Sequence, residues 1–286
     1  MRYEAPSTLE DAVKAAAAEP GVVRFLAGGT DLLVQLRSGM VEPDLVVDLK
    51  RIPETRRIAV EDGGFRIGAA VCGAEIGEHP ALGTAWPGVV EATQLIGSTQ
   101  IQGRASLGGN LCNASPAADS VPALIAAAAV AAIAGPNGRR EVPVEALATG
   151  PGTTSLARDE ILVSIFLPRR PTHAGDAYLR FIPRSEMDIA VVGAGVSLTL
   201  DGGICSAARI ALGAVAERAI LVPAAAEAIV GTAVDEAALS AAAAAASAAC
   251  RPIDDKRGTK AYRTKVAGVL TRRATEIALR RARAGS

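Results

Sequence analysis

The chain has 286 residues and a mass of 29.0 kDa, and its 30 Lys and Arg residues are balanced by 30 Asp and Glu residues. This length is sufficient for two domains or for one domain with subdomains, and the zero net charge gives no overall field that favours nucleic acid or an anionic membrane. The longest apolar run, residues 121–135, is shorter than the roughly 20 residues of a spanning helix, so we expect no membrane span.

The first half of the chain alternates helix and strand patterns. A capping sequence at Ser7-Thr8-Leu9-Glu10 precedes an apolar stripe at helical spacing, which ends at Pro20-Gly21. Thr30 is expected to cap a second helix that runs to Gly39. Strands are predicted over residues 22–26, 44–49 and 65–71, and helices over residues 74–78 and 89–96.

In the second half of the chain, the pattern of alternating elements gives way after a linker to long strands followed by helices. A helix pattern begins at Asp119, and strands are predicted over residues 130–134, 140–144 and 161–167. Pro168-Arg169-Arg170-Pro171 is the best linker, because two prolines resist both helix and sheet continuation. Long strands over residues 178–182, 189–200 and 204–215, with a hairpin turn at Asp201-Gly202-Gly203, are followed by helices over residues 235–249 and 260–283. Strands followed by helices predict an α+β second domain.

Several signatures of catalysis and metal binding are absent from the sequence. It contains no GxSxG, HExxH or GxxxxGK[ST] motif. The four cysteines lie far apart without CxxC spacing, and the chain has two histidines, which argues against zinc, an iron–sulfur cluster or a disulfide framework within it. The N-terminus lacks the pattern of a signal peptide, so we expect a cytoplasmic location.

Two stretches place paired glycines beside small hydroxyl and amide side chains: LAGGTDLL at residues 26–33 and SLGGNLCNASPAADS at residues 106–120. A glycine pair leaves backbone N–H groups uncovered, and a following helix start adds further unpaired donors at a positive dipole end. Both stretches are poor in positive charge, so they predict a diphosphate ligand held by main-chain donors. We expect bulky residues in place of Gly28 and Gly109 to block the ligand without unfolding the protein.

The second stretch has an unusual density of uncharged polar groups. Glycine, asparagine and serine are ordinary loop formers, so a surface loop is one interpretation. Interleaved apolar residues such as Leu107 and Leu111 favour a partly buried loop, whose donors need partners that a ligand can supply. Gly193-Ala194-Gly195 resembles the start of a dinucleotide motif, but it lies in a strand pattern and is interpreted as a strand that needs close packing.

The C-terminal segment RTKVAGVLTRRATEIALRRARA is rich in arginine. Its apolar stripe favours an amphipathic helix with a solvated basic face over docking to a partner subunit, and nucleic-acid binding ranks third.

Together these motifs resemble the FAD-binding medium subunit of molybdenum hydroxylases, the family of xanthine dehydrogenase and aerobic carbon monoxide dehydrogenase. The resemblance is carried by AGGTDLL, QIQGRASLGGNLCNASPAADSVPALIA, EILVSIFLP and RSEMDIAVVGAGVSL, in the family's order. It implies an α+β fold: a two-part FAD-binding domain of the vanillyl-alcohol oxidase (PCMH) type over residues 1–170, with subdomains of about 1–55 and 56–170, and a small α+β domain over residues 171–286.

The resemblance also implies FAD-binding residues. Leu26, Ala27, Gly28, Gly29, Thr30, Asp31 and Leu32 match the family's first pyrophosphate loop, and Ser106, Leu107, Gly108, Gly109 and Asn110 match the second. Asp119 matches the acid that contacts ribityl or ribose hydroxyls, and Leu162 an apolar contact near the adenine or flavin. Arg180 takes the place of a lysine near the flavin ring, and Ile96 takes that of an aromatic residue. Because Asp31 would repel a diphosphate if it faced inward, we expect its carboxylate to accept backbone hydrogen bonds.

The function implied is that of an oxidoreductase subunit. A large partner subunit would hold molybdopterin and oxidise the substrate, and a small one would pass electrons through [2Fe-2S] clusters, in a dimer of heterotrimers. FAD on this chain would deliver them to NAD+, oxygen or a quinone-linked acceptor. Two alternatives remain: a free-standing FAD oxidase of the vanillyl-alcohol oxidase type, and an interaction protein that has kept the fold and lost the flavin.

Overall fold

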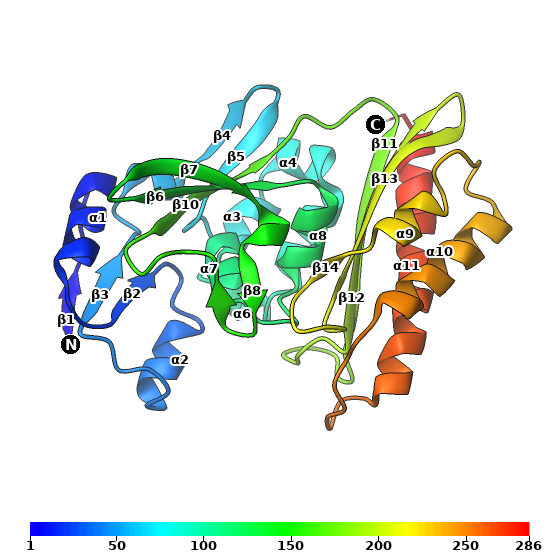
Figure 1. Ribbon diagram of the computed structural model, residues 1–286. Helices are drawn as coiled ribbons and strands as arrows, with labels where there is room; N and C mark the ends of the chain where they lie inside the picture. The colour runs from blue at the N-terminus through cyan, green and yellow to red at the C-terminus, as the bar shows by residue number, and fades with distance from the viewer. Residues whose placement is uncertain (286) are drawn as a thin grey trace.

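The computed structural model describes residues 1–285. Three sheets of three or more strands follow one another along the described residues, with the N-terminus and the C-terminus in opposite halves (Figure 1). The first two sheets lie in the N-terminal half, and the third sheet and the last helices form the C-terminal half. This arrangement confirms the predicted α+β class. No helix among the described residues is both long enough and apolar enough to cross a membrane.

The first sheet is parallel and has the strand order β1-β3-β2. Its elements are β1 (Arg2–Glu4), β2 (Val23–Leu26) and β3 (Leu45–Asp48), joined by α1 (Leu9–Ala18) and α2 (Leu32–Arg37). The Thr8 side chain caps α1 by accepting a hydrogen bond from Asp11 N at 3.1 Å. Strand β1 was not predicted, because it is short and mostly exposed and therefore has no apolar alternation.

The second sheet is antiparallel, in the order β4-β5-β10-β6-β7. Its strands are β4 (Ile58–Glu61), β5 (Gly64–Gly68), β6 (Val130–Gly135), β7 (Gly138–Pro143) and β10 (Ile161–Leu167). Strand β10 lies at the centre and matches its predicted range of 161–167. A register shift between Leu162 and Ser164 interrupts its pairing with β6. An irregularity of this kind re-aims side chains, and it falls where β10 meets the cavity described below.

Short helices connect these strands and cover the second sheet. They are α3 (Gly73–Gly77), α4 (Pro80–Ala85), α5 (Pro87–Gln94), α6 (Thr99–Gln102), α7 (Leu107–Cys112) and α8 (Ser120–Ala126), with 3₁₀ turns at Pro53–Arg56 and Val144–Ala146 and a small ribbon of β8 (Ala148–Gly150) and β9 (Thr153–Thr154). Their buried side chains, Leu107, Leu111 and Leu124 among them, join those of β5 and β10 in one apolar cluster. The glycine-rich segments are therefore attached to a rigid core.

The third sheet is an antiparallel meander in the order β11-β12-β13-β14. It comprises β11 (Ala174–Phe181), β12 (Val192–Asp201), β13 (Ile204–Gly213) and β14 (Ile220–Leu221), followed by α9 (Pro223–Glu227), α10 (Glu236–Ala249) and α11 (Lys260–Arg283). The last two helices cover one face of the sheet (Figure 1), and α5 and α8 meet the other. The φ angles of Gly202 (+55°) and Gly203 (+86°) are those that the predicted hairpin turn needs.

The glycines of β12 confirm the prediction of close packing. A Cβ atom on Gly195 would lie 2.5 Å from the backbone oxygen of Pro122, at the start of α8, and one on Gly193 would lie 2.5 Å from the Tyr178 hydroxyl. Gly195 therefore lets the two halves approach each other, and Gly193 makes room for the Tyr178 side chain of the neighbouring strand β11.

A second contact between the halves involves Asp176. Its carboxylate accepts a hydrogen bond from Gly88 N at 2.7 Å and pairs with Arg170 at 3.3 Å. Burial raises the pKa of Asp176 to about 6, against the opposing effects of Arg170 and the Gly88 N–H. The folded protein therefore binds this proton more tightly than the unfolded chain does.

This difference predicts a pH-dependent contribution to stability. The native state holds the Asp176 proton between pH 3.8 and about 6, whereas the unfolded state has released it. The free energy of unfolding of the wild type, minus that of Asp176→Asn, should therefore fall as the pH rises through this window. Urea denaturation of both proteins at a series of pH values measures the difference. A constant or rising difference would show that the carboxyl is ionised in the folded protein.

Candidate functional site

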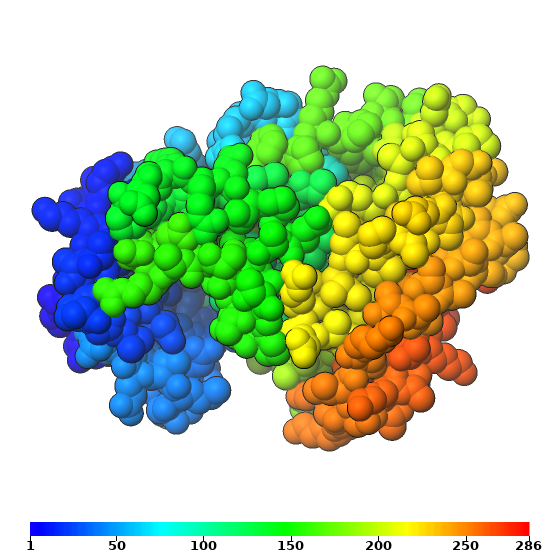
Figure 2. All heavy atoms as spheres, viewed as in Figure 1, coloured from blue at the N-terminus to red at the C-terminus, as the bar shows by residue number. Residues whose placement is uncertain are grey.

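A cavity of about 740 Å³ opens between the first two sheets and is lined by both glycine-rich segments. Figure 2 shows the molecular surface hollowed between the blue N-terminal segments and the green segments. The volume lies within the roughly 300–1,000 Å³ typical of sites for small molecules and cofactors. Two stretches some 80 residues apart in the sequence thus form one site.

The first glycine segment leaves β2 and turns into α2. Gly29 has a φ of +80°, so the turn depends on a residue without a side chain. Among the described residues, no protein group accepts a hydrogen bond from the backbone N–H groups of residues 28–31. These donors are available to a ligand in the cavity, which residues 27–32 line.

The cap of α2 differs from the prediction. Asp31, and not Thr30, occupies the N-cap position, and its side chain makes no capping hydrogen bond. The expectation that the Asp31 carboxylate bonds to backbone donors is therefore wrong. Asp31 has helical φ and ψ angles of −97° and −51°, whereas a side-chain cap usually needs an extended backbone.

The second glycine segment is helical, so the prediction of a partly buried loop is wrong for Leu107–Cys112. Ser106 caps this helix by accepting a hydrogen bond from Gly109 N at 3.1 Å. Gly108 packs against Ala69, the residue that follows β5, since a Cβ atom on Gly108 would lie 2.5 Å from the Ala69 backbone oxygen. Gly109 is less enclosed, because the atom that its Cβ would meet is the Ser106 hydroxyl, at 3.1 Å. Glycine residues concealed this helix in the sequence because they disfavour helical structure.

The two segments touch at Gly28. A Cβ atom on this residue would lie 1.8 Å from the carbonyl oxygen of Arg104, which is too close for any side chain. Replacement of Gly28 must therefore separate the segments, so the expectation that its variants only block a ligand does not hold. Gly109 lines the cavity and is less restricted than Gly28, because an added Cβ atom there requires only a small shift of the Ser106 hydroxyl and no movement of backbone.

Part of the polar density in the second segment has a partner within the protein. The side-chain oxygen of Asn110, Oδ1, accepts hydrogen bonds from the Ser120 hydroxyl at 2.7 Å and from the Ser120 N–H at 3.2 Å. The Gln35 amide donates to Asn113 Oδ1 at 3.1 Å. These bonds join α7 to α8 and α2. A ligand is therefore left chiefly with backbone donors.

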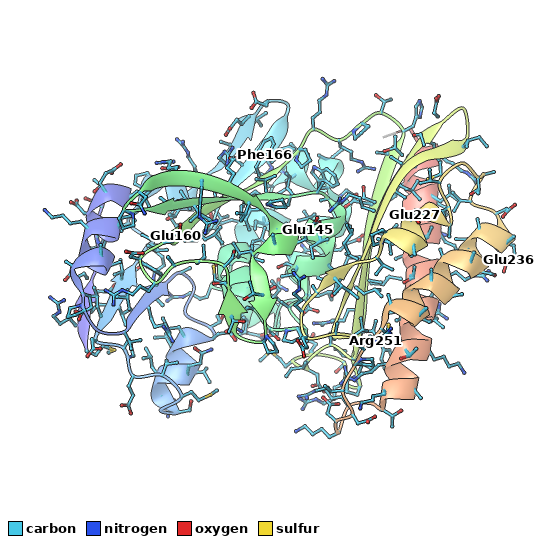
Figure 3. The ribbon with its side chains drawn as sticks, viewed as in Figure 1. Glu145, Glu160, Phe166, Glu227, Glu236 and Arg251 are labelled. Carbon is cyan, nitrogen blue, oxygen red and sulfur yellow. The ribbon has the colours of Figure 1, made fainter. Side chains whose placement is uncertain are left out.

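The far end of the cavity contains residues that the sequence analysis missed. They are Arg24 and Phe25 on β2, and Arg158 and Glu160 before β10. Arg158 donates to the backbone oxygen of Pro20 at 2.9 Å, and Glu160, labelled in Figure 3, accepts from Arg140 at 2.7 Å. Arg158 is bound to a turn some 138 residues earlier, and no local pattern reveals such a contact.

Most predicted site residues line the cavity, but four do not. Ile96 and Leu162 join the two glycine segments in its wall, whereas Leu26, Leu107, Asp119 and Arg180 lie outside it. Leu107 is fully buried in the apolar core. Leu26 ends β2, where its backbone oxygen accepts a hydrogen bond from Leu49 N at 3.0 Å. Leu26 and Leu107 therefore hold the glycine segments in place without facing the cavity.

Asp119 and Arg180 form a buried ion pair between the two halves of the molecule. Arg180 donates to Asp119 Oδ2 at 2.8 Å and to the backbone oxygen of Leu95 at 2.7 Å, and the Tyr178 hydroxyl donates to Asp119 Oδ1 at 3.1 Å. Both charged side chains are largely buried: 6% of the Arg180 side chain and 11% of the Asp119 side chain are exposed. Burial raises the pKa of Asp119 to about 6, although Arg180 and Tyr178 favour the ionised form.

The donor set is suited to a diphosphate. Two short helices begin at the cavity, and the first N–H groups of a helix lack partners within it, although that of Gly109 is already bonded to Ser106. No side chain with acid–base function is placed there in the manner of a catalytic triad, and the described residues contain no group of three His, Cys, Asp or Glu that could hold a metal ion. The geometry thus favours binding and orientation of a phosphorylated ligand.

Comparisons with known proteins agree with this geometry. Residues 1–170 match the FAD binding domain in molybdopterin dehydrogenase, and residues 177–278 match the CO dehydrogenase flavoprotein C-terminal domain. The chain is 35% identical over 287 residues to the carbon monoxide dehydrogenase medium chain of Afipia carboxidovorans, covering 98% of this chain and 97% of that one. It is 37% identical over 216 residues to a xanthine dehydrogenase FAD-binding subunit of Escherichia coli, and this match covers 75% of this chain and 74% of that subunit.

A solved structure of similar form is carbon monoxide dehydrogenase from Hydrogenophaga pseudoflava, in a form that lacks the Mo-pyranopterin moiety of its cofactor. One of its chains superimposes with a TM-score of 0.94 at 34% identity, covering 98% of both chains.

Proposed function

Because the chain belongs to the family of FAD-binding subunits of molybdopterin-dependent dehydrogenases, we propose that it carries FAD in the cavity between its first two sheets. We propose further that it transfers electrons from the [2Fe-2S] clusters of a small partner subunit to NAD+, oxygen or a quinone-linked acceptor. A large partner subunit with molybdopterin would oxidise the organic substrate. Names of similar proteins, such as "medium chain", support such an assembly.

The observation that carries the proposal is the convergence of both glycine segments on one cavity. The unpaired N–H groups of residues 28–31 and the start of α7 would hold the diphosphate. Ile96 and Leu162 would provide apolar contacts along the same wall. Bound FAD supplies the redox chemistry, and the protein supplies orientation, electrostatics and exclusion of water.

Asp119 and Arg180 have a less direct place in the proposal. Both Asp119 oxygens accept hydrogen bonds within the protein, and neither residue lines the cavity. Arg180 nevertheless bonds to Leu95, whose neighbour Ile96 lies in the cavity wall. We propose that the pair fixes this part of the wall, and that a contact of Asp119 with ligand hydroxyls would require one of its present bonds to be shared.

We expect the protein to bind FAD more tightly than FMN. Two donor segments suit a diphosphate with an adenosine beyond it, whereas FMN has one phosphate and no adenosine. Loss of even one charge-assisted hydrogen bond lowers affinity by about tenfold or more. We therefore expect FAD to bind at least about tenfold more tightly, as measured by fluorescence titration. Equal affinities would place the diphosphate and adenosine outside the cavity.

The acceptor is tested on the same FAD-loaded protein. After anaerobic photoreduction, the protein is mixed separately with NAD+, oxygen and a soluble quinone, and recovery of flavin absorbance is followed. Recovery with one of these acceptors at a rate well above that of the others would identify the physiological class. No recovery with any of them would contradict the proposed electron delivery.

A further inference from the structure

A hydrogen-bond network lies directly behind the first glycine segment. Lys50 Nζ donates to the backbone oxygen of Ala27 at 3.0 Å and lies 2.8 Å from each carboxylate oxygen of Asp48. The Tyr3 hydroxyl donates to Asp48 Oδ2 at 2.6 Å. Asp48 is buried and Lys50 is half-buried. None of the three residues lines the cavity, so the network reaches it only through the Ala27 carbonyl.

The parallel sheet brings the network together. Leu26 pairs with Asp48 at the carboxyl ends of β2 and β3, and Tyr3 lies on β1 opposite Val46. In open sheets of this kind, ligands bind outside the carboxyl ends of the strands. Lys50 follows β3 at this edge, as the glycine segment follows β2. The sheet therefore places an ammonium group next to the peptide that begins the turn.

The ammonium group determines which way this peptide faces. A trans peptide is planar, and its C=O and N–H bonds point in opposite directions. Since the Ala27 oxygen points to Lys50, the Gly28 N–H points away from Lys50, and no protein group among residues 1–285 accepts a hydrogen bond from it. If this peptide were to flip, the carbonyl oxygen would replace the N–H and repel a phosphate.

We infer that Lys50, held by Asp48 and Tyr3, is a positioning residue that fixes the Ala27–Gly28 peptide with its N–H available to the diphosphate of FAD. This inference rests on the proposed function. Asp48 is suited to its part, because hydrogen bonds from Lys50 and Tyr3 hold its pKa below the ordinary value although burial opposes ionisation. The network can thus retain its ion pair at neutral pH.

The test compares a ligand with a diphosphate and one without. The full-length protein, freed of flavin, is titrated with ADP and with adenosine by calorimetry, as wild type and as Lys50→Met. We expect Lys50→Met to weaken ADP binding by about tenfold, the effect of one charge-assisted hydrogen bond, and to change adenosine binding less than about twofold. A general loss of structure would weaken both ligands alike, and that result would overturn the inference.

A second variant and a matched control complete the design. Asp48→Asn retains the shape of the network and weakens its hold on the ammonium group, so ADP binding should again fall while adenosine binding does not. Lys260→Met removes an ammonium group from the ion pair with Asp254, 3.8 Å away in the C-terminal half, and should change neither ligand. Unchanged ADP binding in both Lys50→Met and Asp48→Asn would contradict the inference. A wild-type protein that binds neither ADP nor FAD would instead contradict the proposed function, and the inference with it.

Discussion

Gly109→Val should lower the affinity for FAD by about tenfold to a hundredfold, which corresponds to about 1.4 to 2.8 kcal/mol. The new side chain would enter the cavity beside the start of α7, where the diphosphate is proposed to lie. The fold should persist with a small loss of stability, because the Ser106 hydroxyl, 3.1 Å from the added Cβ atom, must shift slightly and its cap bond to Gly109 N is weakened. Fluorescence titration gives the affinity, and thermal unfolding without flavin gives the stability.

The matched control is Gly83→Val. This glycine lies in α4 of the same half, and a Cβ atom there meets no protein atom within 4 Å. It does not line the cavity, so FAD affinity should be unchanged. Equal affinity of Gly109→Val and wild type would place the diphosphate elsewhere. Gly28→Ala is unsuitable for this test, because its clash with the Arg104 carbonyl would disturb both segments.

Asp119→Ala should lower the free energy of unfolding by about 3–5 kcal/mol, because it leaves the buried guanidinium of Arg180 without its partner. The Tyr178 hydroxyl loses its acceptor in the same variant. Urea denaturation of the flavin-free protein measures this effect. A loss below about 1 kcal/mol would show that the pair contributes no more than a surface ion pair.

Two further variants separate the possible roles of this pair. Asp119→Ala combined with Arg180→Met should recover part of the stability, since replacing both buried charges is commonly less damaging than removing one. Glu4→Ala breaks the exposed contact with Arg2, at 3.7 Å, and should cost less than about 1 kcal/mol. If Asp119→Ala weakened FAD binding without loss of stability, the carboxylate would act on the ligand directly.

Regular elements with strong patterns could be predicted from the sequence. Strand β10 and helix α11 have their predicted bounds, because the first is an apolar run interrupted only by Ser164 and the second is a long amphipathic repeat. Helix α7 was missed because its glycines have low helix propensity, and it is held by the Ser106 cap and by Leu107 and Leu111 in the core. Tertiary packing overrides local propensity at this site.

The glycine segments of the site were predictable because their chemistry is local. Paired glycines beside hydroxyl and amide residues indicate exposed backbone donors, as the N–H groups of residues 28–31, unpartnered among the described residues, show. The role of Lys50 was not predictable, since its bond to Ala27 depends on the parallel pairing of β2 and β3. The partner of Asp119 could not be predicted either, because Arg180 lies 61 residues away on a strand of the other half.

The most direct test of the electron-transfer role is the rate at which flavin absorbance bleaches after anaerobic mixing with the substrate that the assembled enzyme oxidises. Three samples are compared: the FAD-loaded chain alone, the complex with both partner subunits, and the complex without the iron–sulfur subunit. We expect bleaching only in the complete complex, because in the proposed function the substrate is oxidised on the large partner subunit and electrons reach FAD through the iron–sulfur subunit. Rapid bleaching of the chain alone would contradict the proposal and identify the protein as a free-standing oxidase.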